Sequence, residues 1–181
     1  MKKILSACAV AAAFVAAPAF AQGYIGGGFG SSRVTGVDGG GVTGGNTNKS
    51  QVKVYGGFQF TPTWGVEAQF SDLGKRDISQ YGVAAGSLKA SQFSIAGTGT
   101  LPLSSGFSLL GKLGVSANRV SGGGVVPNGS ATSALIGIGV SYNITPALSA
   151  RLEYEDFGTV AKFNPPTVRA NAYSISLKYA F

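Results

Sequence analysis

A few charged side chains interrupt segments that otherwise alternate between apolar and small residues. Glu67 lies in "WGVEAQFS", Lys112 lies in "FSLLGKLGV", and Arg151 and Glu153 share "LSARLEYED". Carboxylates that face guanidinium or ammonium groups form charge-assisted hydrogen bonds. Inside a protein such groups must be paired, because an orphaned partner costs about 3–5 kcal/mol. These four residues therefore suggest a buried charge network, which acts either as a structural plug or as a gate that opens to admit ions.

The same residues offer little to catalysis. The sequence has no histidine, so a Ser-His-acid arrangement is impossible. Glu153 and Glu155 share the face that we expect to point inward and Asp156 begins the rim, so no acid pair faces a substrate. The glycine runs "YIGGGFG" and "DGGGVTGG" precede no predicted helix, whose N-terminal N–H groups a phosphate site needs. We expect no enzyme activity, no cofactor and no metal site, and Cys8 is the only cysteine.

Alternation with a period of two is the dominant pattern in the chain, and it predicts strands. In "AYSISLKYAF", for example, large apolar residues alternate with serine, lysine and alanine. Comparable segments occur at residues 24–32, 51–60, 64–71, 91–101, 107–115, 133–144, 148–156 and 172–181. No helical periodicity appears outside the N-terminal segment, so we predict an all-β chain.

The connections between these segments alternate between long and short. Short turns are predicted at residues 61–63, 102–106 and 145–147, and long polar or glycine-rich loops near residues 34–50, 73–87, 119–131 and 158–168. Tight turns at one end and long loops at the other are typical of outer-membrane barrels, whose strands span the bilayer with about 9–11 residues. Hydrocarbon excludes an open sheet edge. We therefore predict an eight-stranded antiparallel up-and-down transmembrane β-barrel whose narrow lumen is filled by side chains.

The alternative is a soluble, lipocalin-like barrel, and the placement of charge argues against it. The predicted lumen residues share their strand faces with glycine and serine, whereas the opposite faces carry valine, isoleucine, leucine and aromatic residues. A soluble barrel with this pattern would bury charges or expose many aromatic side chains to water. The charged fraction of 12% is also about half of the ~25% of ordinary soluble domains.

The N-terminal segment predicts export. Lys2 and Lys3 precede a largely apolar run, and "APAFA" ends in a small-residue cleavage site at Ala19-Phe20-Ala21. The run is shorter than the ~20 apolar residues that a transmembrane helix needs. We expect residues 1–21 to be a cleaved signal peptide used by the Sec pathway. Residues 22–181 then form the barrel in the outer membrane of a Gram-negative-type cell.

The segment "GIGVSYNITPALSARLEYEDFG" resembles the transmembrane domain of OmpA-type outer-membrane proteins. The shared features are a glycine-bearing strand that ends in tyrosine, a short Thr-Pro turn and an Arg-x-Glu-Tyr sequence. "LLGKLGV" and "YIGGGFG" resemble the fifth and first strands of that family. The resemblance implies the same barrel. Larger members continue into a peptidoglycan-binding domain, whereas this chain ends at the barrel, so we expect no anchoring to the cell wall.

The resemblance also implies roles for individual residues. In the family, an arginine on the seventh strand exchanges between acidic partners on the third and sixth strands, with a fourth-strand lysine as a further partner. Arg151 and Glu67 match the arginine and the third-strand acid, whereas Ser141 and Thr98 occupy the other two positions. The terminal aromatic residue, here Phe181, is the insertion signal that the barrel-assembly machinery of the family reads.

Basic side chains gather near the long-loop end. Without Lys2 and Lys3 the chain keeps 12 basic and 7 acidic side chains. The basic residues at or near the long loops are Arg33, Lys49, Lys75, Arg76, Lys89, Arg119, Lys162 and Arg169. They form either a solvated rim or a set of contacts to lipopolysaccharide phosphates, which guanidinium and ammonium groups bind well. Outer-membrane lipid is the expected partner, and nucleic acid is not expected.

Two functions follow from these observations. The first is a non-enzymatic structural or surface-interaction protein whose lumen is closed by a network centred on Glu67 and Arg151. The second is a narrow, porin-like channel for small solutes that is gated by the same network. The sequence names no extracellular ligand.

Overall fold

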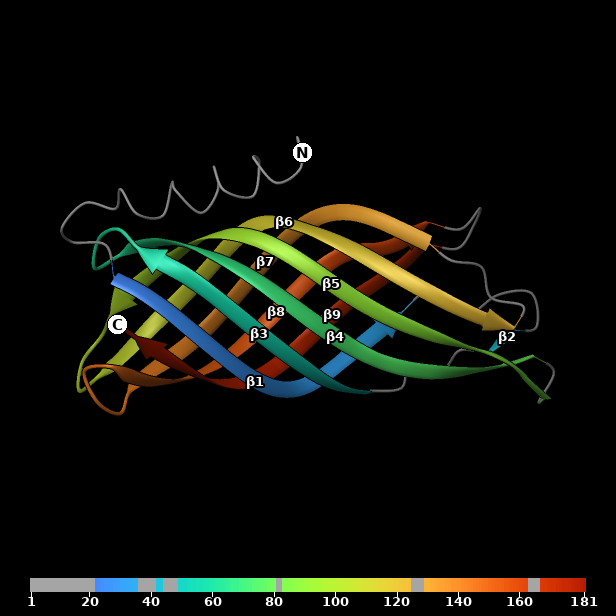
Figure 1. Cartoon of the computed structure of the whole chain (residues 1–181), viewed down its shortest axis with the longest axis horizontal. Coiled ribbons are helices and arrows are strands. Elements are labelled where there is room, and N and C mark those ends of the chain that lie inside the picture. The colour runs from blue at the N-terminus through green and yellow to red at the C-terminus, as the bar shows by residue number, and fades with distance from the viewer. Residues whose placement is uncertain (1–21, 36–41, 44–48, 81–82, 125–128, 163–166) are drawn as a thin grey trace, which may run out of the picture.

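The chain forms a closed antiparallel β-barrel in the computed structural model (Figure 1). The structure describes residues 22–35, 42–43, 49–80, 83–124, 129–162 and 167–181. The strands are β1 (Gln22–Thr35), β2 (Val42–Thr43), β3 (Lys49–Gln59), β4 (Trp64–Gln80), β5 (Val83–Pro102), β6 (Phe107–Gly124), β7 (Gly129–Asn143), β8 (Leu148–Lys162) and β9 (Thr167–Ala180). The described residues include no helix long and apolar enough to cross a membrane.

Eight long strands make the wall, and each pairs with its neighbours in the chain. The barrel closes where β1 pairs with β9, in a register that runs from Tyr24 opposite Ala180 to Thr35 opposite Arg169. The two-residue strand β2 adds only a short pairing to the end of β4, with Val42 opposite Gln80. Every long strand therefore has two hydrogen-bonded neighbours, and the predicted fold class is confirmed.

The two faces of the wall differ in polarity as the alternation predicts. On β7, Ile136, Ile138 and Val140 are exposed on the outer face, whereas Gly139 and Ser141 between and beside them are buried. The outer face carries large apolar side chains all around the barrel, whereas the buried lumen face carries six charged side chains and many serines. This inverted pattern suits a protein that is surrounded by hydrocarbon.

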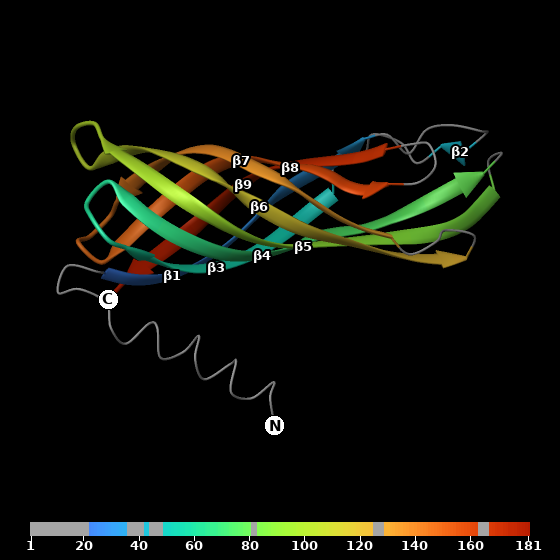
Figure 2. The ribbon, with the colours of Figure 1, turned by 90° about the horizontal axis from the view of Figure 1, so that it is seen from above.

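The start of β1 and the C-terminus lie together at the end of the barrel where the short turns are (Figures 1 and 2). Two of these turns have the same construction. Thr61 Oγ1 accepts a hydrogen bond from the Trp64 amide at 2.9 Å, and Thr145 Oγ1 accepts one from the Leu148 amide at 2.9 Å. Threonine side chains of this kind mimic a backbone turn, which explains the repeated Thr-Pro pair. The predicted short turns are confirmed.

The predicted long loops differ from the structure at the opposite end. Most of residues 73–87, 119–131 and 158–168 belongs to strands, because β4 runs to Gln80, β5 begins at Val83, β6 runs to Gly124 and β8 runs to Lys162. These extensions reach well beyond the length that a bilayer requires. Beyond the membrane both faces of a hairpin meet water, so the apolar alternation stops while the hydrogen-bonded ladder continues. The prediction of long loops was therefore wrong for these three segments.

The extensions begin at two matching bulges. In "DLG" and "DFG" the glycines, Gly74 and Gly158, have positive φ angles of 83° and 62°. Each glycine amide donates a hydrogen bond to the aspartate two residues earlier, at 3.0 Å to Asp72 and 2.7 Å to Asp156. The strand register shifts at both places. A bulge bends the strand and increases its twist, so these motifs mark where the wall leaves the membrane-spanning cylinder.

Candidate functional site

Arg151 and Glu67 meet across the lumen. Arg151 projects from β8 and Glu67 from β4, and Arg151 Nη1 donates a hydrogen bond to Glu67 Oε2 at 2.8 Å. Only 5% of Arg151 and 2% of Glu67 are exposed. The alternation on both strands turns these side chains inward, and the similar distance of each residue from its short turn places them at the same depth.

Lys112 of β6 joins three carboxylates. Its Nζ atom lies 2.6 Å from Glu67 Oε1, 2.6 Å from Glu153 Oε1 and 3.2 Å from Glu155 Oε1. Glu67 is therefore shared between Lys112 and Arg151. The four residues predicted for the lumen lie in one connected set of ion pairs.

Lys53 of β3 completes the network on the other side. It is 1% exposed, and its ammonium group pairs with Glu153 and, at 3.3 Å, with Glu155 Oε2. Gln69 adds a neutral link, because its amide nitrogen donates to Glu155 Oε2 at 3.2 Å. The network thus contains three cations and three carboxylates, so its formal charge is zero.

Two tyrosines support the network from β1 and β3. The Tyr24 hydroxyl donates to Glu67 Oε2 at 3.1 Å, and the Arg151 guanidinium carbon lies 5.2 Å and 5.0 Å from the ring centroids of Tyr24 and Tyr55. Cations over aromatic faces gain an electrostatic attraction. The wall behind these rings must be glycine: a Cβ at Gly26 would lie 2.3 Å from Tyr55, and one at Gly57 would lie 2.6 Å from the Tyr24 hydroxyl. Gly26 of β1 and Gly57 of β3 therefore make room for the two rings.

Among the described residues, the buried side chains on the hairpin side of the network are uncharged. Leu73 and Phe157, the middle residues of the two bulge motifs, are 0% exposed and lie on the inward face. Gln51 and Gln92 are also buried there, and their side-chain amides make no hydrogen bond to another described residue. Ions that pass the charge network would next meet this weakly polar layer.

Sequence reasoning missed Lys53 and Glu155 as members of the network. Both have the lumen-facing alternation that identified the other four residues, and Glu155 is two positions from Glu153. Lys53 of β3 reaches Glu153 of β8 because of the order in which the strands pair around the barrel. The alternation alone does not predict that order. Among the described residues no group of three or more His, Cys, Asp or Glu side chains is placed to hold a metal ion.

The basic residues at the hairpin end are spread around the rim. Arg33, Lys89, Arg119 and Arg169 are exposed and Lys49 is partly exposed. Two have acidic neighbours on the adjacent strand, with Lys89 at 3.1 Å from Asp72 and Arg169 at 3.7 Å from Asp156. The side chains of Lys75, Arg76 and Lys162 lie outside the described residues.

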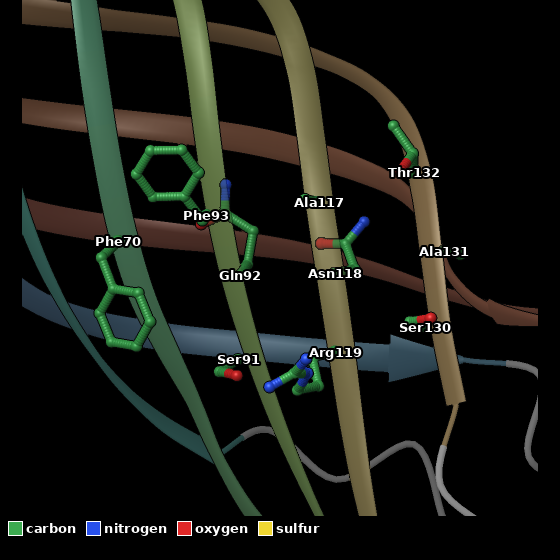
Figure 3. A pocket seen from close by; sticks show the side chains of 10 residues that line it. All are labelled: Phe70, Ser91, Gln92, Phe93, Ala117, Asn118, Arg119, Ser130, Ala131 and Thr132. Carbon is green, nitrogen blue, oxygen red and sulfur yellow. The ribbon is translucent and has the colours of Figure 1, made fainter. Parts of the chain in front are cut away.

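Arg119 borders a hollow of about 540 Å³ in the wall formed by β4 to β7 (Figure 3). The residues opposite Arg119 on the neighbouring strands are Ser91 and Ser130, whose small side chains leave space beside the guanidinium group. Phe70 and Phe93 also line the hollow, and each is 48% exposed. An apolar floor and a guanidinium at its border can contact a lipid chain and an anionic headgroup together.

Phe181 lies at the short-turn end and is 69% exposed on the outer face. Its amide donates to the Gly23 carbonyl at 2.9 Å, which continues the β9–β1 pairing to the last residue. Trp64, Tyr142 and Tyr179 are exposed near the same end. Aromatic residues at the rim of the apolar band are typical of membrane barrels.

A family model for the outer-membrane protein β-barrel domain matches residues 5–181. The chain belongs to this family. It is therefore an integral outer-membrane barrel. In barrels of this kind the short turns lie on the periplasmic side and the long hairpins lie outside the cell. The sequence has no match among the curated proteins with which it was compared.

Solved structures of outer-membrane barrels share the fold of this family member. Ail of Yersinia pestis, in complex with the heparin analogue sucrose octasulfate, is 20% identical with a TM-score of 0.59, over 89% of this chain and 99% of Ail. Neisserial surface protein A is 16% identical with a TM-score of 0.64, over 88% and 97%. OprG of Pseudomonas aeruginosa is 13% identical with a TM-score of 0.65, over 88% and 95%. At these identities the likeness concerns the fold alone.

Proposed function

We propose that this outer-membrane barrel is a sealed, non-enzymatic protein that acts through its outer surface. The observation that carries the proposal is the neutral network of six buried ionic side chains, which bridges the lumen from β3, β4, β6 and β8. An eight-stranded barrel has room for little more than side chains. Leu73 and Phe157 add an apolar layer above the network, which ions cross only at high cost.

Single-channel conductance in a planar bilayer tests the seal. The purified protein should stay silent under voltage once folding is verified, because every path along the lumen crosses the charge network. Discrete openings in the native protein would overturn the sealed-barrel proposal. An Arg151→Ala variant provides the comparison, since it leaves Glu67 with one cation fewer. It should be less stable or leaky; unchanged stability together with silence would show that the pair has neither role.

A gated channel is the second candidate, and one observation favours it. Glu67 is shared by Lys112 and Arg151, and Lys112 is shared by three carboxylates, so Glu67 and Lys112 can each release one partner and keep another. The test replaces the charged pair by a neutral one, Glu67→Gln with Arg151→Gln. Channel openings that occur in the native protein and disappear in this double variant would support the gated channel in place of the seal.

We also propose that the outer rim contacts lipopolysaccharide. The hollow beside Arg119 supports this role, because its lining brings the exposed ring of Phe93 and the guanidinium of Arg119 together. Arg119 forms no ion pair with an acidic residue in the described part of the chain. Ail, which shares the fold, was solved with a polysulfated sugar, and a polyanion of that kind suits a basic rim. Phosphates of the lipopolysaccharide core would pair with Arg119, and an acyl chain would lie along Phe70 and Phe93.

Thermal unfolding in vesicles with and without lipopolysaccharide tests this partner. Lipopolysaccharide should raise the unfolding temperature of the native protein, and an Arg119→Gln variant should lose most of the increase. Lys89→Gln is the matched control, since Lys89 already pairs with Asp72. An equal increase in all three proteins would exclude Arg119 as a contact.

The biogenesis of the barrel is proposed to follow the sequence signals. Residues 1–21 act as a signal peptide, and β1 begins at Gln22, the first residue after the cleavage site. The exposed Phe181 ring is accessible to the barrel-assembly machinery before it enters the bilayer. Deleting Phe181 should lower the amount of folded protein in the outer membrane, whereas refolding of the purified variant in detergent should change little.

A further inference from the structure

A small cavity lies inside the barrel between the charge network and the periplasm. Its volume is about 230 Å³, and the described residues that line it include no aspartate or glutamate. Arg151 lies at its inner end and Lys178 on its wall, together with the hydroxyl-bearing residues Thr100, Ser108, Ser141 and Ser149. We call this cavity the periplasmic vestibule.

The vestibule carries a positive charge that the described residues do not balance. The six-residue network is neutral by itself, and Lys178 is a further cation on the lumen face of β9. No carboxylate of the described chain, including the C-terminus, forms an ion pair with Lys178. Its ammonium group instead lies 5.2 Å from the ring centroid of Tyr24. A partly enclosed charge of this kind is stabilised when a counter-ion joins it.

Hydrogen-bond donors are also available around this charge. Arg151 has five N–H donors, of which one bonds to Glu67. Its guanidinium lies 5.2 Å from the same Tyr24 ring as Lys178, so one aromatic ring orients both cations. The hydroxyls of Ser108 and Ser141, each residue 8% exposed, have no hydrogen-bond partner among the described residues.

We propose that the periplasmic vestibule binds a small, freely diffusing oxyanion such as inorganic phosphate or sulfate. Lys178 and Arg151 supply charge-assisted hydrogen bonds, and Ser108 and Ser141 donate to the remaining oxygens. A water molecule occupies about 30 Å³ in the liquid, so a cavity of about 230 Å³ holds a tetrahedral anion and several waters. The closed wall of paired strands separates the vestibule from the lipids, which favours a free anion over a headgroup.

Nuclear magnetic resonance of the purified protein in phosphatidylcholine nanodiscs tests the site. Sodium sulfate is titrated against sodium chloride at constant ionic strength, and backbone amide shifts are followed near Ser149 and Lys178. The shifts should saturate, and Lys178→Gln should weaken the affinity by about tenfold, as expected for one charged hydrogen bond. Lys178→Arg should retain saturable binding, because it retains the charge.

Lys89→Gln is the control, because Lys89 is a lysine at the opposite end of the barrel that pairs with Asp72. It should bind sulfate as the native protein does. Shifts that never saturate, or equal affinity in Lys178→Gln and the native protein, would overturn the site. Nanodiscs that contain the anionic lipid phosphatidylglycerol distinguish a free anion from a lipid headgroup. A sulfate affinity equal to that in phosphatidylcholine supports a free anion. A lower sulfate affinity overturns that assignment and identifies the lipid headgroup as the occupant.

Discussion

At the residue scale, the lumen holds six buried charges that balance one another. Each carboxylate contacts at least one cation, and Lys112 contacts all three. Buried ion pairs are not in themselves a source of stability, because desolvation of the ions offsets their attraction. What they impose is a penalty on any change that removes one partner. The loss should therefore grow with the number of opposite charges that the removed residue leaves behind.

Lys112→Met should lower the free energy of unfolding more than Lys53→Met does. The first change leaves Glu67, Glu153 and Glu155 without their common cation, whereas the second leaves two carboxylates that still contact Lys112. We expect a loss of about 3–5 kcal/mol for Lys112→Met, the usual cost of a broken buried pair. Denaturant unfolding in lipid vesicles measures the difference.

Lys89→Gln is the reference for that comparison, since its pair with Asp72 is 59% and 38% exposed. An exposed pair of this kind contributes about 0–1 kcal/mol. If Lys112→Met were no more destabilising than Lys89→Gln, the lumen network would not have the ionisation that the short contacts indicate.

At the element scale, the barrel wall depends on the places where a strand changes direction. Gly74 on β4 and Gly158 on β8 provide the left-handed conformation at the two bulges, and the preceding aspartates hold the turn. Each bulge begins an extension of the wall beyond the bilayer. The positive φ angles at both bulges favour glycine over any residue with a side chain.

Gly74→Ala should therefore destabilise the barrel by about 1–2 kcal/mol, the cost of a left-handed conformation for an L-residue. Its new Cβ would also lie 2.8 Å from the Ser50 carbonyl oxygen. Gly111→Ala is the matched change on β6, where no atom lies within 4 Å of the new Cβ. Comparable unfolding free energies for the two variants would contradict the assigned strain.

The outer hairpins offer a separate test at this scale. Residues 75–79 of β4 pair with residues 84–89 of β5, including Arg76 opposite Leu88 and Asp77 opposite Ser87. Amide hydrogens in a ladder exchange slowly with solvent, whereas those of a flexible loop exchange at once. Hydrogen exchange followed by mass spectrometry should show protection in this hairpin. If its amides exchanged as fast as those of the exposed turn at Ser104 and Ser105, the result would favour the loop prediction.

These elements also show what the sequence can and cannot predict. The spanning strands and the inward direction of Glu67 and Arg151 follow from alternation, because one wet face and one lipid face impose a period of two. The outer hairpins cannot be predicted in this way, because both of their faces meet water and their sequence therefore lacks the alternation of apolar and polar residues. The link between Lys53 and Glu153 required the barrel to close, and long side chains from distant strands meet only after the strand order and register are set.

At the scale of the whole molecule, the barrel is inside-out relative to a soluble protein. Exposed side chains such as Phe29, Leu113 and Leu152 are 62–69% exposed, whereas charged side chains fill the lumen. In water an apolar surface of this extent would drive aggregation. Surrounded by lipid it costs nothing, and the depth of each outward residue then decides how well it tolerates a charge.

Leu113→Arg and Ser130→Arg should lower the free energy of unfolding by different amounts, because the two residues lie at different depths. Leu113 is 67% exposed next to the central Lys112, so it faces the middle of the hydrocarbon, whereas Ser130 lies opposite Arg119 near the outer rim. An arginine costs about 2–4 kcal/mol at the midplane of a membrane barrel and about 0–1 kcal/mol near the interface. Reversible unfolding in phospholipid vesicles should show this order. Equal losses at the two positions would mean that the apolar band does not contact lipid. In water both positions are exposed, so arginine would cost about the same at either depth.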